Sequence, residues 1–132
     1  MLKNEVRREG LFTQIPKYVR KQVLRTHCSL CKLRYNQVVT LPGNKIVFPK
    51  QVLHHLISRR FLQEHGIYEH HVSNLISICN REHSKLLRIE DRLFQGDVIG
   101  FLTGCKMVGI PPERIIKFAL SVGLKEFGGL TI

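Results

Sequence analysis

The chain has 132 residues, and 43% of them are hydrophobic, so it can form one domain with a real core. Its apolar runs are interrupted by charge or Gly before they reach membrane-spanning length. The first ten residues are charged throughout, so we expect no secretory signal and an intracellular protein, in the cytoplasm of a bacterial or host cell. Thiols stay reduced there, which favours metal ligands or buried thiols over disulfides for the four Cys.

The positive charge is concentrated in the N-terminal half. The formal net charge is +11; residues 1–60 contain 13 Lys or Arg and 2 Asp or Glu, whereas residues 61–132 contain 8 of each kind. Such a one-sided positive field favours a polyphosphate partner. A merely basic soluble surface and an anionic membrane are the alternatives, and the asymmetry favours nucleic acid over both.

Residues 1–14 read as a loose basic arm that precedes an amphipathic helix over about residues 16–26. Pro16 suits the first helical position. Apolar residues recur on one face of this helix, and cations occupy the other. Arg20 and Lys21 on that cationic face are candidate nucleic-acid contacts.

Two cysteines follow at the spacing Cys28-x-x-Cys31. A knuckle with this spacing can offer both thiolates to one tetrahedral Zn²⁺. A redox pair is the alternative, although no strand–helix redox context surrounds it. Pro42-Gly43-Asn44 then predicts a turn between two short strands near residues 38–39 and 46–48.

The central part of the chain predicts strand, loop, strand and helix. The first strand, 52–57, carries His54 and His55, and the polar stretch 61–73 reads as a connection that can include one helical turn before Gly66. The second strand covers 74–78, and Asn80 is a good N-cap for a helix over 80–94 that carries His83.

The C-terminal part, residues 95–132, predicts a helical extension behind a first domain over residues 1–94. Two apolar or amphipathic stretches, 98–108 and 112–122, read as helices, and Gly123 ends the second. They offer a docking surface or a homodimer interface. The tail 125–132 is expected to be loosely ordered.

The order of these motifs resembles the HNH family of metal-dependent nucleases over about residues 16–90. The agreements are the His54-His55 pair at a strand end, the run NLISIC from Asn74 to Cys79, and His83 four residues after Cys79. The fold that this implies is α+β: a small ββα-metal core with an N-terminal helix and zinc knuckle, plus C-terminal helices. The implied activity is hydrolysis of phosphodiester bonds in DNA.

The resemblance also implies roles for individual residues. His54 and His83 would hold one divalent metal, Mg²⁺ or Mn²⁺, with Ni²⁺ or Zn²⁺ as alternatives. His55, on the opposite side of the strand, would be the general base, a task that favours a pKa near neutral. Asn74 would bridge backbone groups of the loop and so fix the His55 ring. The implied catalytic group is therefore His54, His55, Asn74 and His83.

Arg59 and Arg60, just past the first strand, are candidates for holding backbone phosphates. The connection between His55 and Asn74 is long for this motif, and its extra residues include further histidines that either contact substrate or merely lengthen the loop, namely His65, His70 and His71. Leu87 stands where some family members carry a further metal-binding His.

A structural Zn²⁺ held by Cys28, Cys31 and Cys79 is expected, with the fourth ligand unassigned. The zinc-containing members of the family have a second CxxC, but here Glu82 stands in place of the fourth Cys. Zn²⁺ does accept carboxylates. The remaining candidates are His27 and Cys105, and a site that has lost its metal and keeps packed thiols is the other alternative.

Two further interpretations compete with an active endonuclease. One is a non-catalytic zinc-knuckle module that binds nucleic acid, which has no need for all of His54, His55, Asn74 and His83. The other is a small assembly protein that docks onto a larger phage or mobile-element machine, as the resemblance to phage proteins allows. The expected partners are thus DNA and such a machine, and no membrane. DNA contacts are expected to be mainly to phosphates, with weak sequence preference.

Overall fold

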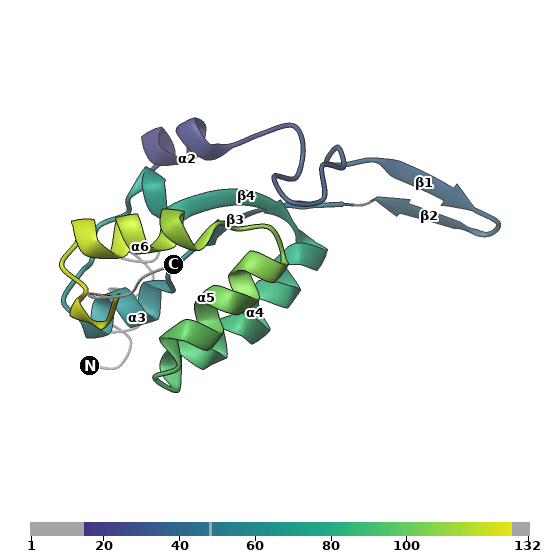
Figure 1. The fold of residues 1–132 in the computed structure, drawn as a ribbon. Coiled ribbons are helices and arrows are strands. Elements are labelled where there is room, and N and C mark those ends of the chain that lie inside the picture. The colour runs from purple at the N-terminus through teal and green to yellow at the C-terminus, as the bar shows by residue number, and fades with distance from the viewer. Residues whose placement is uncertain (1–14, 48, 128–132) are drawn as a thin grey trace, which may run out of the picture.

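The computed structural model describes residues 15–47 and 49–127, and it is an α+β structure (Figure 1). The helices are α2 (Lys17–Val23), α3 (Arg59–Glu64), α4 (Asn80–Phe94), α5 (Val98–Met107) and α6 (Pro112–Ser121), with 3₁₀ turns η1 (Val72–Asn74) and η2 (Lys125–Phe127). The strands are β1 (Val38–Leu41), β2 (Asn44–Val47), β3 (Gln51–His55) and β4 (Leu75–Cys79). They form two antiparallel pairs, β1 with β2 and β3 with β4.

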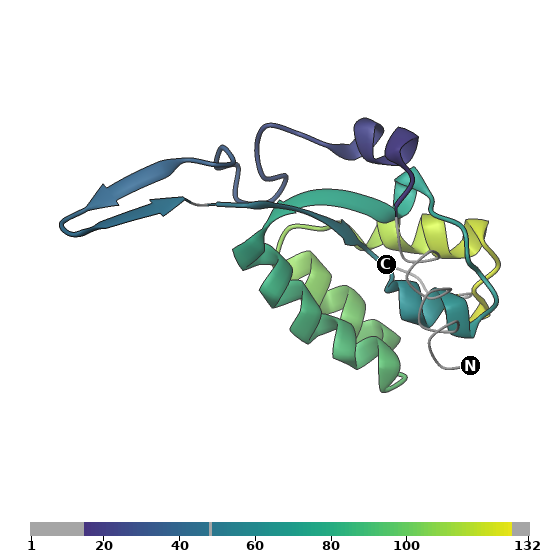
Figure 2. The same ribbon diagram turned by 180° about the vertical axis from the view of Figure 1, so that it is seen from behind.

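The β3–β4 pair lies between α2 on one face and α4 on the other (Figures 1 and 2). Its register places His54 opposite Ile76 and His55 opposite Leu75. Because side chains alternate along a strand, neighbouring residues point to opposite faces. The α2 face buries Leu75 together with residues of α2, and the α4 face contributes Ile76 and Ile78 to the main core.

Helices α4 and α5 lie side by side in both views (Figures 1 and 2). Asp97 begins α5 by accepting a hydrogen bond from the Gly100 N–H. A Cβ on Gly104 would come within 2.7 Å of Ile89 Cγ2. The absence of a side chain at Gly104 therefore allows the two helices to pack this closely.

The C-terminal helices belong to the main core. Their apolar side chains, including Phe101, Ile115 and Phe118, are buried in one cluster with residues of β4 and α4. The expectation that 98–108 and 112–122 form helices is confirmed, with slightly different ends. A homodimer or docking role for them stays a prediction, although most of their apolar surface packs inside the molecule.

The expectation of a loose tail is wrong for residues 125–127. They form η2, and Phe127 is fully buried in the core. His65 Nε2 lies 2.9 Å from the Glu126 carboxylate and so links η2 to the end of α3. An aromatic residue followed by two glycines resembles a frayed end in sequence, but burying the Phe127 ring orders this turn. Residues 128–132, like the basic arm 1–14, lie outside the described residues.

Several predicted boundaries need correction. Helix α2 ends at Val23 because Leu24 is already extended, and Pro16 is its N-cap rather than its first helical residue. The helical turn expected before Gly66 is present, but helix α3 already begins at Arg59, just past the predicted end of the first strand. The start of the connection 61–73 is not polar, because Phe61 and Leu62 are buried in the core.

The N-cap of α4 is Cys79 and not Asn80, which is the first helical residue. The Asn80 side chain instead accepts a hydrogen bond from the Lys50 backbone N–H at 3.1 Å. It therefore connects the start of α4 to the residue before β3. The predicted span of the helix, 80–94, is confirmed.

The β1–β2 hairpin projects away from the remainder of the molecule (Figure 1). Leu41 pairs with Asn44, and Gly43 has φ +83°, a left-handed conformation that favours glycine in a turn. The turn predicted at Pro42-Gly43-Asn44 is thus confirmed, and both short strands are present; Phe48 lies outside the described residues. Within the described part of the chain, no helix combines the length and apolar character of a membrane span.

Candidate functional site

Three cysteines from two distant segments of the chain meet at one end of the β3–β4 pair. Cys28 and Cys31 lie on the loop after α2, and Cys79 is the last residue of β4. Their sulfur atoms all lie within 4.8 Å of one another. The loop is joined to β4 by the backbone N–H of Ser29, which donates to the Ser77 carbonyl at 3.0 Å. The knuckle is therefore held against the strand that carries its third cysteine.

The hydrogen bonds around Cys28 favour a thiolate. Its Sγ accepts backbone N–H groups from Cys31 at 3.4 Å and from Cys79 at 3.2 Å. Burial alone would raise the pKa of Cys28, but these N–H groups outweigh it and the pKa is lowered. Burial raises the pKa of Cys31 to about 11, and the neighbouring sulfurs add to this rise. A cation between the sulfurs would offset that repulsion.

The three thiols fit a tetrahedral zinc site. Two sulfurs that bind one Zn²⁺ at about 2.3 Å are about 3.8 Å apart, and Cys31 Sγ lies 3.7 Å from Cys79 Sγ. The cluster can thus hold a metal ion such as zinc through three ligands.

None of the three candidates for a fourth zinc ligand belongs to this cluster within the described residues. Glu82 pairs with Lys85 at 3.3 Å. The His27 ring bonds to the Thr26 hydroxyl at 2.8 Å. Cys105 is buried on α5, and burial raises its pKa to about 12, so it is a packed neutral thiol. A fourth zinc ligand would therefore have to come from a group other than these cysteines and the three candidates.

His54 and His83 meet between β3 and α4. Their Nδ1 atoms are 3.1 Å apart, and the rings are inclined by 72° with centroids 5.1 Å apart. Burial first, and then His83, lower the pKa of His54 to about 3, and burial also lowers the pKa of His83. Both imidazoles are therefore neutral at pH 7, which metal coordination requires.

The distance between these two nitrogens suits either of two arrangements. One is an N–H···N hydrogen bond between neutral rings. The other is a single ion bound by both nitrogens, since metal–nitrogen bonds of about 2.1 Å with an angle of 90–110° separate the nitrogens by about 3 Å. The strand and the helix thus bring together the two residues that the family resemblance would make the ligands of a catalytic metal.

His55 points to the opposite side of β3 and contacts His70. The His55 Nε2 atom lies 3.3 Å from His70 Nδ1. Burial, followed by His70, Arg59 and His54, lowers the pKa of His55 to about 3. This is well below the near-neutral value that we expected, because the nearby cationic or protonatable groups add to the effect of burial. His55 is therefore unprotonated at neutral pH, and an anionic phosphate beside it would raise its pKa toward that range.

Asn74 is fully buried beside the end of β3, and its side chain bridges the backbone of Ile57. Its Oδ1 accepts the Ile57 N–H at 2.8 Å, and its Nδ2 donates to the Ile57 carbonyl at 3.0 Å. The Asn74 carbonyl also accepts the Leu56 N–H at 2.8 Å. Asn74 does bridge backbone groups as expected, and it fixes the turn directly after His55.

A pocket of about 170 Å³ opens beside the histidines. Its lining includes His54, His55, His83 and Arg59, together with Glu90. We did not predict a role for Glu90, although it shares the α4 face of His83 two turns farther along. Burial raises its pKa, and a hydrogen bond with Ser58 acts in the opposite direction. Glu90 thus places a partly buried carboxyl group in the pocket wall.

The predicted phosphate-binding arginines differ in environment. Arg59 is 8% exposed, and its Nη1 donates to the Tyr68 carbonyl at 2.7 Å, which anchors the loop between α3 and η1. Arg60 is exposed, lies 4.1 Å above the Phe94 ring and is 3.9 Å from the Glu64 carboxylate. Both arginines therefore lie on α3, but only Arg59 lines the histidine pocket.

Arg20 and Lys21 are exposed on α2, on the other side of the β3–β4 pair from α4. Of the three extra loop histidines, only His70 contacts His55. His65 bonds to Glu126, and the His71 ring packs against Phe118 with centroids 5.5 Å apart. These two positions therefore stabilise the loop and the C-terminal turn.

Comparisons with protein-family models, with curated proteins and with solved structures gave no match. The functional argument therefore depends on the geometry of the site.

The cysteine cluster predicts one equivalent of bound zinc. Cys31→Ser is expected to lose the metal, because it removes one of three ligands. Cys105→Ala is the matched control, since Cys105 lies outside the cluster, and it should keep the metal. Metal content measured by plasma mass spectrometry on purified protein tests this. Equal zinc in both variants, or none in the parent after refolding with zinc, would show that the thiols are merely packed.

The Asn74 bridge predicts a large loss of stability on its removal. Asn74→Ala would leave the buried N–H and carbonyl of Ile57 without these partners, at a cost of about 2–4 kcal/mol. Asn44→Ala, in the exposed hairpin turn, should change the free energy of unfolding by less than about 1 kcal/mol. Urea unfolding of both variants measures the difference. A similar effect of the two substitutions would contradict a structural role for the bridge.

Proposed function

We propose that the chain is a metal-dependent DNA endonuclease of the HNH type, with a ββα core formed by β3, β4 and α4. The observation that carries this proposal is the meeting of His54 and His83, with Nδ1 atoms 3.1 Å apart, beside a pocket that His55 also lines. A purely structural pair of histidines would not need a neutral third histidine and a buried arginine at the same opening. The order of strand, strand and helix supports the same assignment.

The pair of His54 and His83 would hold the catalytic divalent ion, which supplies positive charge for a phosphate oxygen and for the leaving 3′ oxygen. Both rings are neutral, so their nitrogens are available without loss of a proton. The Nδ1 of each ring faces the shared position. Mg²⁺ usually prefers oxygen ligands, and imidazole suits transition metals better. This favours Mn²⁺ or Ni²⁺ as the more active ions.

His55 would act as the general base. It accepts a proton from the attacking water as the water oxygen bonds to phosphorus and the bond from phosphorus to the 3′ oxygen breaks. Its neutral state at pH 7 suits this task. Asn74 is a positioning residue, because it fixes the Ile57 backbone directly beyond the strand end. Arg59 contributes positive charge to the pocket wall near the phosphate.

The positive surplus of residues 1–60 supports DNA as the substrate. The exposed cations Arg20 and Lys21 on α2, together with Arg60 on α3, are proposed to contact the DNA backbone. Such contacts predict binding that weakens steeply with salt and differs little between sequences. Association with a larger phage or mobile-element machine, and self-association, are compatible with this activity.

Cleavage of supercoiled plasmid tests the proposed function. The parent should nick the plasmid with Mn²⁺, Ni²⁺ or Mg²⁺ and not with EDTA. His55→Ala should lower the rate about 10²–10⁴-fold, because it removes the general base. His83→Ala should lower it at least as far, because it removes half of the proposed protein ligand pair.

His71→Ala is the matched control, because this imidazole packs against Phe118 outside the pocket. It should cleave at nearly the parental rate. Binding of DNA without cleavage under every metal would contradict the proposal and favour a non-catalytic zinc-knuckle module. Equal loss in all three variants would show that the effect is on folding rather than on catalysis.

A further inference from the structure

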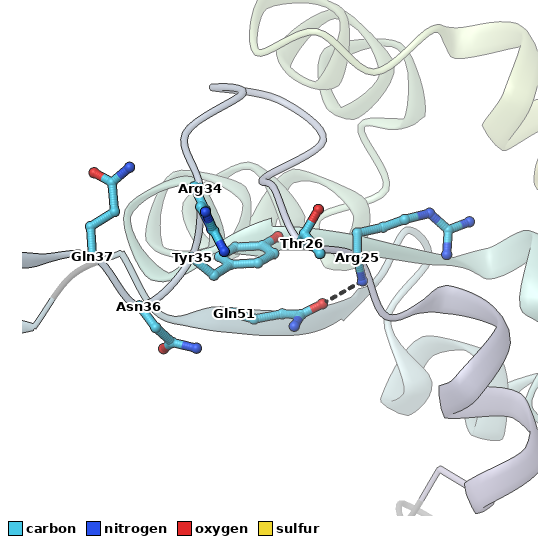
Figure 3. A pocket seen from close by; sticks show the side chains of 7 residues that line it. All are labelled: Arg25, Thr26, Arg34, Tyr35, Asn36, Gln37 and Gln51. Atoms are coloured by element: carbon cyan, nitrogen blue, oxygen red, sulfur yellow. Dashed lines mark hydrogen bonds between the residues drawn. The ribbon is translucent and has the colours of Figure 1, made fainter.

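A second and larger hollow lies at the other end of β3, where the loop after the cysteine knuckle meets the strand (Figure 3). Its volume is about 600 Å³, within the range of small-ligand pockets. The loop contributes Arg34, Tyr35, Asn36 and Gln37, and β3 contributes Gln51. None of these residues belongs to the histidine pocket or to the cysteine cluster.

A chain of hydrogen bonds fixes the orientation of the Gln51 amide. Its Oε1 accepts the Arg25 backbone N–H at 3.0 Å (Figure 3) and also the Ser77 hydroxyl at 2.7 Å. Since the Ser77 proton is used for Gln51, the Tyr35 hydroxyl donates to Ser77 Oγ at 2.6 Å. With its oxygen held by two donors, the Gln51 amide group offers its N–H₂ as a donor at the pocket wall.

The pocket is rich in amide groups and contains no carboxylate in its lining. The Arg25 guanidinium is bonded to the carbonyls of Gln22 and Leu24, at the end of α2, so Arg34 is the cation at this site. Amides that both donate and accept match the edges of nucleobases, and a guanidinium matches a phosphate or a guanine edge. Asn36 has φ +61°, and its N–H donates to the Pro49 carbonyl at 2.7 Å, so its backbone is fixed as well.

We propose that this pocket binds one unpaired nucleotide of the nucleic-acid strand, with the base at the Gln51 and Asn36 amides and a phosphate at Arg34. A base within a duplex already uses its pairing edge and cannot enter a concave pocket, so the occupant has to be unpaired. The basic N-terminal half supports a nucleic acid over a neutral metabolite.

The position of the pocket connects this inference to the histidine site. Gln51 and His55 lie on the same face of β3, four residues apart, which is about 13 Å at ~3.3 Å per residue. That distance corresponds to a few nucleotides of single-stranded nucleic acid, which would pass along the edge of β3, because α2 packs over this face at Leu53 and Leu75. Where cleavage is concerned, the inference rests on the proposed function, and the pocket would favour substrates with an unpaired base near the cut.

Binding to a fluorescein-labelled single-stranded oligodeoxynucleotide tests the pocket without any cleavage. The measurement is fluorescence anisotropy in a His83→Ala background with no added divalent metal. Gln51→Glu keeps an oxygen for its two donors but replaces the outward amide with a carboxylate. It should raise Kd about tenfold or more. Asn36→Gly, which tolerates the positive φ and adds no charge, should raise Kd about threefold or more.

Gln95→Glu is the matched control, an exposed position at the far end of α4 with the same chemical change. It should change Kd less than about twofold. On a fully paired duplex of the same sequence, the penalty of Gln51→Glu should be smaller than on the single strand. The assignment is overturned if both pocket variants match the control, or if the duplex loses as much as the single strand.

These outcomes are separable from those of the plasmid assay. Loss of single-strand binding in the pocket variants, in a protein that never cleaves, would leave the pocket assignment standing and remove the proposed function. Metal-dependent cleavage, together with unaltered single-strand binding in the pocket variants, would support the proposed function and remove the pocket assignment.

Discussion

The antiparallel register of β3 and β4 determines where the reactive side chains of this molecule lie. Pairing His54 with Ile76 turns His54 toward α4, and the alternation of the strand turns His55 to the opposite side. A shift of one residue would exchange the two histidines and separate His54 from His83. Asn74 stabilises this register at one end, because its side chain holds both backbone groups of Ile57 directly beyond β3.

The other end of the same strand pair is held by the cysteine knuckle. Gln51 pairs with Cys79, so the last residue of β4 belongs both to the sheet and to the sulfur cluster. The Ser29 N–H and the Tyr35 hydroxyl add hydrogen bonds to Ser77 in the middle of β4. A metal in this cluster would therefore stabilise the strand pair on which the histidine pocket is built, without being part of that pocket.

The features that local patterns encode were predictable. The helix 80–94 follows from hydrophobic periodicity, and the hairpin turn follows from the turn residues Pro42-Gly43-Asn44. The proximity of Cys28 to Cys31 follows from their short spacing in sequence. The meeting of His54 with His83 and the bridge from Asn74 followed only from the resemblance to a known family, because residues so far apart in sequence meet through tertiary structure. Their observed distances agree with that expectation, while their catalytic roles remain a proposal.

Other features depended on packing that local patterns do not reveal. Helix α3 buries Phe61 and Leu62 in the core, and burial of Phe127 orders residues 125–127. The low pKa of His55 depends on burial and on His70 and Arg59, which come from different segments. The fourth zinc ligand was sought among His27, Glu82 and Cys105, and tertiary structure places all three outside the cluster.

The central claim is that His54 and His83 share one divalent ion rather than a hydrogen bond. A crystal structure of the protein soaked with Mn²⁺, with anomalous data collected near the manganese edge, tests this claim most directly. The account predicts an anomalous peak about 2.2 Å from both Nδ1 atoms, in the pocket that His55 lines. Rings that keep their direct N–H···N contact, with no peak between them at saturating Mn²⁺, would contradict it.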